Sequence, residues 1–263
     1  MLTGKNILII GGTSGMGLSA AKAFIRQGAR VVATGKDAES CVTAQKTLGN
    51  MARIVECDAR EEYTAEQAIA VCRENWGELH GLYHIAGGSG RRFGDGPLHE
   101  MSLEGWNATF QLNLNSMMLS NRAAIRTFRQ QGQGGAILNM GSVLGFSPSP
   151  AFFTTHAYAA AKSAVIGFSR SIAAYYAAEN IRVNVIAPGL IDTPMAKRAA
   201  QDQTIQDFIH TKQPLDGGRI GQAQDLDAAA SLLLSDAGRF ITGQVLSVDG
   251  GWQLTEGQIP KQS

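Results

Sequence analysis

The chain has 263 residues, and its 23 Lys and Arg residues nearly balance 22 Asp and Glu residues, for a net charge of +1. This balance argues against broad electrostatic binding to nucleic acid or to an anionic membrane, so we expect neither as a partner. Hydrophobic residues make up 44% and charged residues 17%, which is typical of a packed globular protein and excludes disorder. Three cysteines without CxxC spacing and an N-terminus without a signal-peptide core favour a cytoplasmic protein.

Short aliphatic runs alternate along the chain with segments of helical length. The predicted strands are Asn6–Ile10, Arg30–Thr34, Arg53–Cys57, Leu82–Ala86, Ala136–Met140, Arg182–Ala187 and Gln244–Val248. The predicted helices are Leu18–Gln27, Ala65–Trp76, Leu103–Arg129, Ala157–Ala178 and Leu226–Leu234. Nearly continuous apolar strands are typical of a parallel sheet that is covered on both faces. The alternation predicts an α/β fold, with a doubly wound seven-stranded parallel sheet and helices on both faces, as a single domain over residues 1–263.

Three loops follow predicted strands and are therefore expected at the carboxyl edge of the sheet, where open α/β sheets bind ligands. Gly87–Pro97 is rich in glycine and contains Arg91 and Arg92, and Phe146–Thr155 is rich in Pro, Ser and aromatic residues. The third segment, residues 193–218, ends in Gly217-Gly218 as a possible hinge. We expect it to form a flap over the substrate.

A glycine-rich loop, Gly11-Gly12-Thr13-Ser14-Gly15-Met16-Gly17, joins the first predicted strand to the first predicted helix. Its GxxxGxG spacing is related to the dinucleotide-binding fingerprint, in which glycines allow a tight turn and let the backbone approach a pyrophosphate. The N-terminus of the following helix offers N–H groups to phosphate. The absence of a GK[ST] sequence disfavours a P-loop. A plain strand–helix turn, or the glycine loop of a methyltransferase, would show the same pattern.

Tyr158 and Lys162 lie one helical turn apart on a largely apolar stripe of the predicted helix Ala157–Ala178. An ammonium near a phenol favours the phenolate and lowers a pKa that is ~10 when unperturbed. Such a phenol exchanges a proton with a carbonyl or alcohol oxygen near neutral pH. The alternative is an amphipathic helix with a core tyrosine and a lysine whose charged end reaches water.

Two further polar residues bear on that choice. Ser142 follows the fifth predicted strand, where its hydroxyl can donate to a substrate oxygen or simply cap a turn. Asn113 lies on an apolar helical stripe, and a buried Asn must be hydrogen-bonded, either for structure or to hold a water near the site.

Together these features resemble the short-chain dehydrogenase/reductase family from about residue 3 to residue 252. The resemblance rests on GxxxGxG at 11–17, Asp58, Asn113, Ser142, Tyr158-Ala-Ala-Ala-Lys162, Pro188-Gly189 and the tail Ile241-Thr-Gly-Gln-Val-Leu-Ser-Val-Asp-Gly-Gly251. It implies a Rossmann fold and an NAD(P)-dependent oxidoreductase that interconverts a secondary alcohol and a ketone by hydride transfer. No metal is implied.

The resemblance also implies a role for each matching residue. Tyr158 would be the acid/base, Lys162 would lower the pKa of Tyr158 and bind the nicotinamide ribose, Ser142 would polarise the carbonyl, and Asn113 would hold a water. The other cofactor-binding positions implied are Gly11, Thr13, Ser14, Gly15, Met16, Gly17, Lys36, Asp58, Ala59, Ala86, Gly87, Pro188, Gly189, Ile191 and Thr193.

The sequence departs from the family pattern in places. His84-Ile85-Ala86-Gly87 stands where the family has Asn-Asn-Ala-Gly, and we interpret His84 as structural rather than catalytic. The loop between Ser142 and Tyr158 is longer than is usual and is expected beside the substrate. The pair Arg91-Arg92 is compatible both with an anionic substrate group and with a solvated basic turn.

NADP(H) is the expected cofactor, with NAD(H) as the alternative. The second predicted strand ends in Gly35 and lacks the carboxylate that normally binds the ribose 2′-hydroxyl and repels a 2′-phosphate. Lys36 follows, and its ammonium can pair with that phosphate. Two residues favour NAD(H) instead. Asp37 is next in the chain, and Ser14 stands where many NADP-preferring relatives carry a basic residue.

Two alternatives to a ketone reductase stay open: a catalytically silent, cofactor-binding regulatory member of the same fold, and a glycine-loop transferase. The expected substrate is a small carbonyl or alcohol compound, with 3-oxoacyl thioesters, sugars and steroids all open. The resemblance, together with the apolar, Ala-rich helices Leu103–Arg129 and Ala157–Ala178, predicts a homotetramer.

Overall fold

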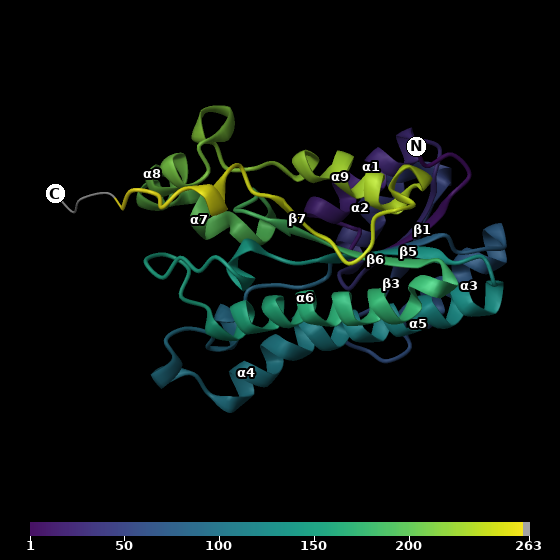
Figure 1. Ribbon diagram of the computed structural model, residues 1–263, viewed down its shortest axis with the longest axis horizontal. Coiled ribbons are helices and arrows are strands. Elements are labelled where there is room, and N and C mark those ends of the chain that lie inside the picture. Colours follow the sequence, from purple (N-terminus) through teal and green to yellow (C-terminus); the bar gives the residue numbers. More distant parts are fainter. Residues whose placement is uncertain (260–263) are drawn as a thin grey trace.

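A seven-stranded parallel sheet runs through the centre of the molecule (Figure 1). The structure is a computed structural model that describes residues 1–259 except the side chain of Met195, so residues 260–263 of the expected span lie outside the described residues. The strands are β1 Asn6–Ile10, β2 Arg30–Gly35, β3 Ala52–Glu56, β4 Gly81–His84, β5 Gly135–Met140, β6 Ile181–Pro188 and β7 Val245–Val248. They lie in the order β3-β2-β1-β4-β5-β6-β7, and every neighbouring pair is parallel. The predicted doubly wound sheet is confirmed.

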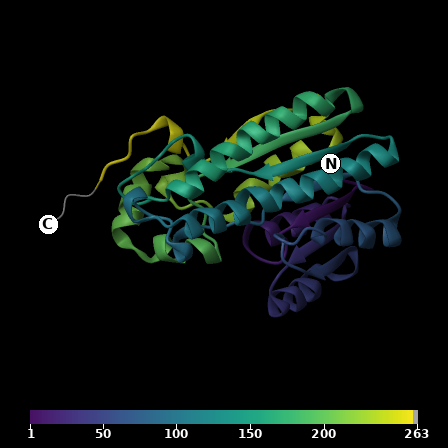
Figure 2. The same cartoon turned by 90° about the horizontal axis from the view of Figure 1, so that it is seen from below.

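Helices cover both faces of this sheet (Figures 1 and 2). They are α1 Gly15–Arg26, α2 Ala38–Leu48, α3 Thr64–Trp76, α4 Leu103–Phe110, α5 Ser116–Gln131, α6 His156–Tyr176, α7 Lys197–Gln201, α8 Gln203–Lys212 and α9 Asp227–Leu234. Buried side chains of α1 and α9 pack on one face of the sheet, and those of α3, α5 and α6 pack on the other.

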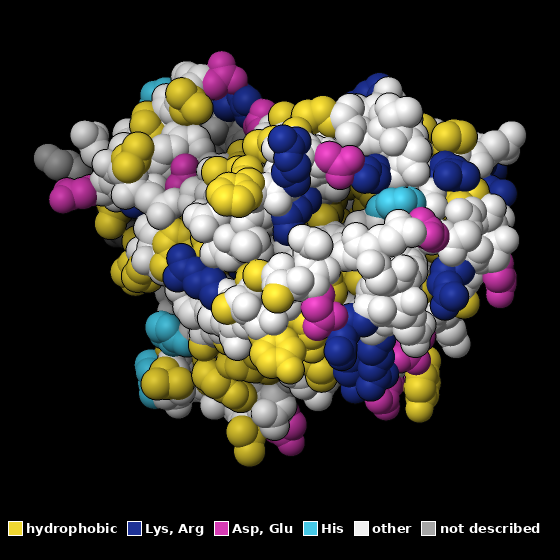
Figure 3. All heavy atoms as spheres, turned by 45° about the vertical axis from the view of Figure 1, so that its right-hand side comes forward, with side chains coloured by type: hydrophobic (Ala, Val, Ile, Leu, Met, Phe, Trp, Pro, Cys, Tyr) yellow, Lys and Arg dark blue, Asp and Glu magenta, His cyan; other side chains and the backbone are white. Residues whose placement is uncertain are grey.

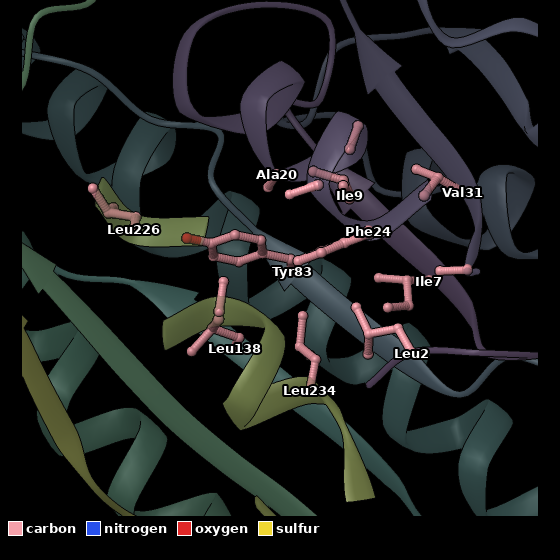
Figure 4. Packing of buried hydrophobic residues seen from close by; sticks show 14 of the residues in the cluster. Leu2, Ile7, Ile9, Ala20, Phe24, Val31, Tyr83, Leu138, Leu226 and Leu234 are labelled. Atoms are coloured by element: carbon pink, nitrogen blue, oxygen red, sulfur yellow. The ribbon is translucent and has the colours of Figure 1, made fainter. Parts of the chain in front are cut away.

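The side chains of strand β1 pack into the cores on both faces of the sheet. Ile7 and Ile9 pack in the core beneath α1, where Phe24 and Tyr83 join them (Figure 4), whereas the alternate residues Leu8 and Ile10 belong to the core beneath α3 and α5. Successive side chains of a strand point to opposite faces, so a strand buried on both faces needs an uninterrupted apolar run. All five side chains of β1 are buried.

The predicted helix Leu103–Arg129 is not continuous. It consists of α4 and α5, joined by a π-helical turn at Gln111–Asn115. Apolar spacing alone did not indicate this interruption, because the stripe carries on through the turn. Single π-helical turns inside α-helices occur frequently at functional sites, and this one carries Asn113.

Two other predictions needed correction. The fourth strand ends at His84 rather than at Ala86, because the N–H groups of Ile85 and Ala86 both donate to the carbonyl oxygen of Ile10, at 2.9 Å each, and the chain leaves the sheet there. Helix α2 was not predicted; it begins after Asp37, whose carboxylate accepts a hydrogen bond from the N–H of Ser40 at 2.7 Å.

The surface carries charges of both signs. On the face in Figure 3, Lys and Arg side chains are interspersed with Asp and Glu side chains. Of the helices within residues 1–259, none combines the length and the apolar composition that crossing a bilayer requires.

Candidate active site

The glycine-rich loop packs so closely that a side chain would not fit at Gly11, Gly12 or Gly17. A Cβ atom on Gly17 would overlap the carbonyl oxygen of Gly11, and one on Gly11, which has φ of +86°, would lie 2.8 Å from the backbone nitrogen of Ala86. Ser14 immediately precedes α1, yet its side chain makes no capping hydrogen bond. The N–H groups of the first helical turn, at Gly15 to Gly17, therefore stay available to an anion.

The segment after β6 lies opposite this loop. A Cβ atom on Gly15 would lie 3.6 Å from the methyl group of Thr193, so the two segments face each other across a narrow gap. The buried side chain of Gln213 accepts a hydrogen bond from the N–H of Leu190 at 2.5 Å. It also packs against Gly189, where a Cβ atom would lie 2.6 Å from the Gln213 side-chain oxygen. Gln213 was not among the expected residues, because its partners are far from it in the chain.

A charged cluster lies beyond the ends of β2 and β3. Arg60 contacts both carboxylate oxygens of Asp58, with a shortest distance of 2.6 Å, and Lys36 lies 3.9 Å from the same carboxylate. The bond from Arg60 is the main reason that the pKa of Asp58 falls to about 2. Ala59 lies between Asp58 and Arg60 in the chain. Arg60 was not among the expected residues, although its position two residues after Asp58 was visible.

Ser142 and Tyr158 are neighbours in the wall of one cavity. Ser142 follows β5 and is buried, and its hydroxyl accepts a hydrogen bond from the N–H of Leu144 at 3.2 Å. Tyr158 lies in the first turn of α6 and is partly buried. Burial raises the pKa of Tyr158, while a hydrogen bond with the Ser142 side chain acts in the opposite direction.

Lys162 is fully enclosed beneath Tyr158. Its ammonium nitrogen donates to the carbonyl oxygen of Met140 at 2.8 Å and lies 5.6 Å from the centre of the Tyr158 ring. Burial lowers the pKa of Lys162 to about 8. The expectation that Lys162 lowers the pKa of Tyr158 is not met here: burial outweighs other influences on the phenol, and the group that opposes it is Ser142.

Asn113 holds the loop after β4. Its side-chain oxygen accepts from the N–H of Gly88 at 3.0 Å, and its amide nitrogen donates to the carbonyl oxygens of Gly88 and Thr109, both at 2.9 Å. A Cβ atom on Gly87 would lie 2.8 Å from that side-chain oxygen and 3.5 Å from the Lys162 nitrogen. Asn113, Gly87 and Lys162 therefore meet, but both amide hydrogens of Asn113 are used by backbone carbonyls rather than left for a water.

Asp95 fixes the start of α6 from a distant part of the chain. Its two carboxylate oxygens accept hydrogen bonds from the N–H groups of Ala157 and Tyr158, both at 2.9 Å, and its side chain is buried. A carboxylate at a helix N-terminus satisfies N–H groups that have no partner within the helix. No local pattern indicated this contact, because 62 residues separate Asp95 from Ala157.

His84 lies below the site and does not line the cavity. One ring nitrogen is 2.7 Å from the hydroxyl of Ser120 and the other is 3.0 Å from the carbonyl oxygen of Ala86. Burial lowers its pKa to about 3, so the imidazole is neutral at physiological pH. These contacts favour the structural interpretation of His84.

The cavity has a volume of about 180 Å³ and a predominantly apolar wall. Met16 from the glycine-rich loop lines it together with Ser142 and Tyr158, so the expected pyrophosphate site and the two hydroxyl groups adjoin one space. Other lining residues come from the end of β6, from the segment after it and from near the end of the described chain: Pro188, Gly189, Ile191, Thr193 and Trp252.

Comparison with known proteins places this geometry in a family. Residues 11–253 match the family model described as enoyl-(acyl carrier protein) reductase. The chain is 34% identical to a 3-oxoacyl-[acyl-carrier-protein] reductase of Chlamydia trachomatis over 251 residues, which is 95% of this chain and 98% of the relative. A solved structure of a short-chain type dehydrogenase/reductase from Mycobacterium ulcerans superposes with a TM-score of 0.89 at 31% identity, covering 97% of this chain and 92% of the other. The chain belongs to the short-chain dehydrogenase/reductase family.

Two further relatives show the range of the family. A 2,5-dichloro-2,5-cyclohexadiene-1,4-diol dehydrogenase of Sphingobium indicum is 31% identical, over 95% of this chain and 98% of the relative. A 3beta-hydroxysteroid dehydrogenase of Eggerthella lenta is 30% identical over 96% of each chain. This short-chain dehydrogenase/reductase is therefore an oxidoreductase with a Rossmann-like fold, and its family uses a nicotinamide cofactor.

The residues of this short-chain dehydrogenase/reductase fit such a cofactor. The first turn of α1 has N–H groups without a capping side chain, as a pyrophosphate requires. Glycines occupy the three loop positions, Gly11, Gly12 and Gly17, at which a Cβ atom would block the close packing. The loop shares a wall of the cavity with Tyr158, so these residues would hold the pyrophosphate of a dinucleotide in the same space as the phenol.

Proposed function

We propose that this enzyme interconverts a secondary alcohol and a ketone with NADP(H), and that Tyr158 is its acid/base. The observation that carries the proposal is the neighbouring pair of Ser142 and Tyr158 in the wall of one cavity that also includes the glycine-rich loop. The bound nicotinamide supplies or accepts the hydride. The relatives' names describe substrates of very different size, so the shared feature is the carbonyl or hydroxyl group.

The protonation state of Tyr158 suits the reduction of a ketone. With its pKa raised by burial, the phenol is protonated at neutral pH and can donate its proton to the carbonyl oxygen as negative charge develops there. The hydroxyl of Ser142 donates to the same oxygen and polarises the carbonyl. In the oxidation of an alcohol, the same two groups act in reverse.

Two other residues support the pair. We assign Lys162 to the nicotinamide ribose hydroxyls, since its ammonium is held in place by the carbonyl of Met140 directly beneath the phenol. We assign Asn113 to the loop at Gly87 and Gly88, which it fixes next to Lys162. The bonds of Asn113 support a positioning role rather than the holding of a water.

The substitution Tyr158→Phe tests the proposal. Loss of a positioned acid/base group should lower kcat by a factor on the order of 10² or more, with the dissociation constant of the cofactor nearly unchanged. The matched control is Tyr175→Phe, on the exposed side of the same helix. A Tyr158→Phe enzyme with near-normal kcat on a verified substrate would exclude this role, and cofactor binding without turnover of any ketone or alcohol would favour the silent, regulatory alternative.

The preference for NADP(H) rests on the charges around the ends of β2 and β3. Gly35 ends β2 without a carboxylate, and the next side chain, Lys36, is exposed and carries a positive charge beside Asp58. The carboxylate of Asp37, which counted against NADP(H), is engaged in capping α2. A 2′-phosphate is therefore expected to meet an ammonium rather than a free carboxylate.

Comparison of the two cofactors tests this preference. Lys36→Ala should lower kcat/KM for NADP(H) about tenfold or more, as expected for a charge-assisted hydrogen bond, with little change for NAD(H). Lys46→Ala, on the exposed side of α2, is the control and should change neither. A wild-type preference for NAD(H) would show that the missing carboxylate does not decide the specificity.

A further inference from the structure

Among the described residues that line the substrate cavity, two arginines are the only ones with charged side chains. Arg91 comes from the loop after β4, and Arg198 comes from α7. The rest of the wall is apolar or carries hydroxyl groups, and the apolar part includes Val143, Leu144, Phe153 and Trp252. The cavity thus offers an apolar body with positive charge in one part of its wall.

The two guanidinium groups converge on one point. A terminal nitrogen of Arg91 donates to the carbonyl oxygen of Phe152 at 3.1 Å, and a terminal nitrogen of Arg198 donates to the same oxygen at 3.4 Å. Burial and the neighbouring charge of Arg198 both lower the pKa of Arg91. Two like charges are therefore held together where α7 meets the loops after β4 and β5, which by itself is unfavourable.

No carboxylate in the described part of the chain neutralises this pair within 4.0 Å. Asp95 acts electrostatically on Arg91, but both of its oxygens are used by the N–H groups at the start of α6. The carbonyl of Phe152 takes one donor from each arginine, whereas a guanidinium has several. Both arginines are exposed, so most of their donors are open to water or to another acceptor.

We propose that the substrate carries an oxyanion, a carboxylate or a phosphate, which Arg91 and Arg198 bind together while the reacting carbonyl lies beside Ser142 and Tyr158. The planar fork of a guanidinium matches both kinds of oxyanion, with two parallel hydrogen bonds from each arginine. This inference rests on the proposed ketone–alcohol chemistry and adds the class of substrate. The bound anion would also fasten α7 to the loops at Arg91 and Phe152.

Matched pairs of ketone substrates, one anionic and one neutral, isolate the effect of the negative charge. One part of the experiment compares straight-chain carboxylates of several lengths, each with a methyl ketone at the far end, with their methyl esters. The other part compares 3-oxobutanoyl pantetheine with its 4′-phosphate. Preference for the free acids identifies a carboxylate substrate, and preference for the phosphorylated thioester identifies a phosphate-bearing carrier arm.

The variants are Arg91→Gln and Arg198→Gln, each with a neighbouring control. Arg92 stacks on the ring of Phe93, with 4.6 Å between its guanidinium carbon and the ring centre, and neither Arg92 nor Lys197 lines the cavity, so Arg92→Gln and Lys197→Gln are the controls. Each cavity variant should lower kcat/KM about tenfold or more for the anionic member of a pair, mainly through KM, and change the neutral member by less than about twofold. The controls should change neither.

Equal losses for the anionic and neutral members, or no preference for the anion in the wild type, would overturn the proposal. A binding measurement keeps it distinct from the proposed chemistry: calorimetry compares octanoate with 1-octanol, neither of which presents a ketone, in the wild type and the same variants. If no ketone is reduced but octanoate binds through Arg91 and Arg198, the oxyanion site stands and the proposed function fails. If octanoate binds the wild type no better than the arginine variants, the oxyanion site is wrong.

Discussion

At the scale of single residues, the groups that the sequence brought to attention share one property: each stands at a fixed spacing within one element or immediately after one. Tyr158 and Lys162 are one turn apart on α6, and Ser142 follows β5, so periodicity and the strand–loop order were enough to expect them together. Asp95 and Gln213 were missed because they act through contacts far along the chain. The pKa of Tyr158 was predicted in the wrong direction because burial is a property of the folded molecule.

Asp95 offers a prediction at this scale. Asp95→Ala should destabilise the protein by about 1–2 kcal/mol through loss of the cap of α6, and should lower kcat because Tyr158 is the second residue it holds. Asp95→Asn keeps one acceptor oxygen and should restore part of both. Thermal unfolding and steady-state kinetics measure the two effects.

A second helix N-cap serves as a control for the effect of lost stability alone. Ser102 caps α4 by accepting from the N–H of Gly105 at 3.0 Å, so Ser102→Ala should lower stability with kcat unchanged. If Asp95→Ala lowers the melting temperature but leaves kcat and its pH profile like those of Ser102→Ala, then Asp95 has a structural role only.

At the scale of elements, the presence of a strand or helix was easier to predict than the residues at which it begins and ends. The strand runs were correct to within about two residues, because burial on both faces leaves an unbroken apolar signature. The early end of β4 depends on hydrogen bonds from Ile85 and Ala86 to another strand, and the π-helical turn at Gln111–Asn115 contains Asn113, which bonds to Gly88, so no periodicity reports either feature. The segment 193–218, expected to form a flap, contains α7 and α8.

We predict that residues 193–218 act as a flap. Three consecutive residues at its far end, Asp216 to Gly218, have positive φ, which suits a hinge. The segment also buries Ile205, Phe208 and Ile209 against Trp252, so opening has to separate a small apolar cluster. Hydrogen exchange in this segment should be fast without ligand and slow with cofactor plus a substrate analogue; equal protection in both states would contradict the prediction.

At the scale of the whole molecule, apolar surface remains on the helices that were expected to be too apolar for exposure. A groove between α5 and α6 includes Met118, Phe168 and Ile172, and Tyr175 nearby has 75% of its surface exposed. The edge strand β7 also leaves Leu246 partly exposed. Symmetric packing of such faces is the usual way to bury them in an oligomer.

We predict a homotetramer. Light scattering at micromolar concentration should give a particle of four times the 27.9 kDa chain mass. Phe168→Asp, which adds a charge in the groove between α5 and α6, should shift the particle towards smaller species. A wild-type mass of a single chain would contradict the prediction.

The substrate cavity takes Met16 from near the beginning of the chain and Trp252 from near its end, with strands β2 to β7 between them in the sequence. During synthesis on the ribosome, the residues of β1 and of the glycine-rich loop emerge long before the residues of the aromatic wall. A nascent or prematurely terminated chain would have the residues of the glycine-rich loop but no closed cavity. Catalytic competence is thus the last property that translation confers, and unfinished chains have no enclosed site in which to consume reduced cofactor.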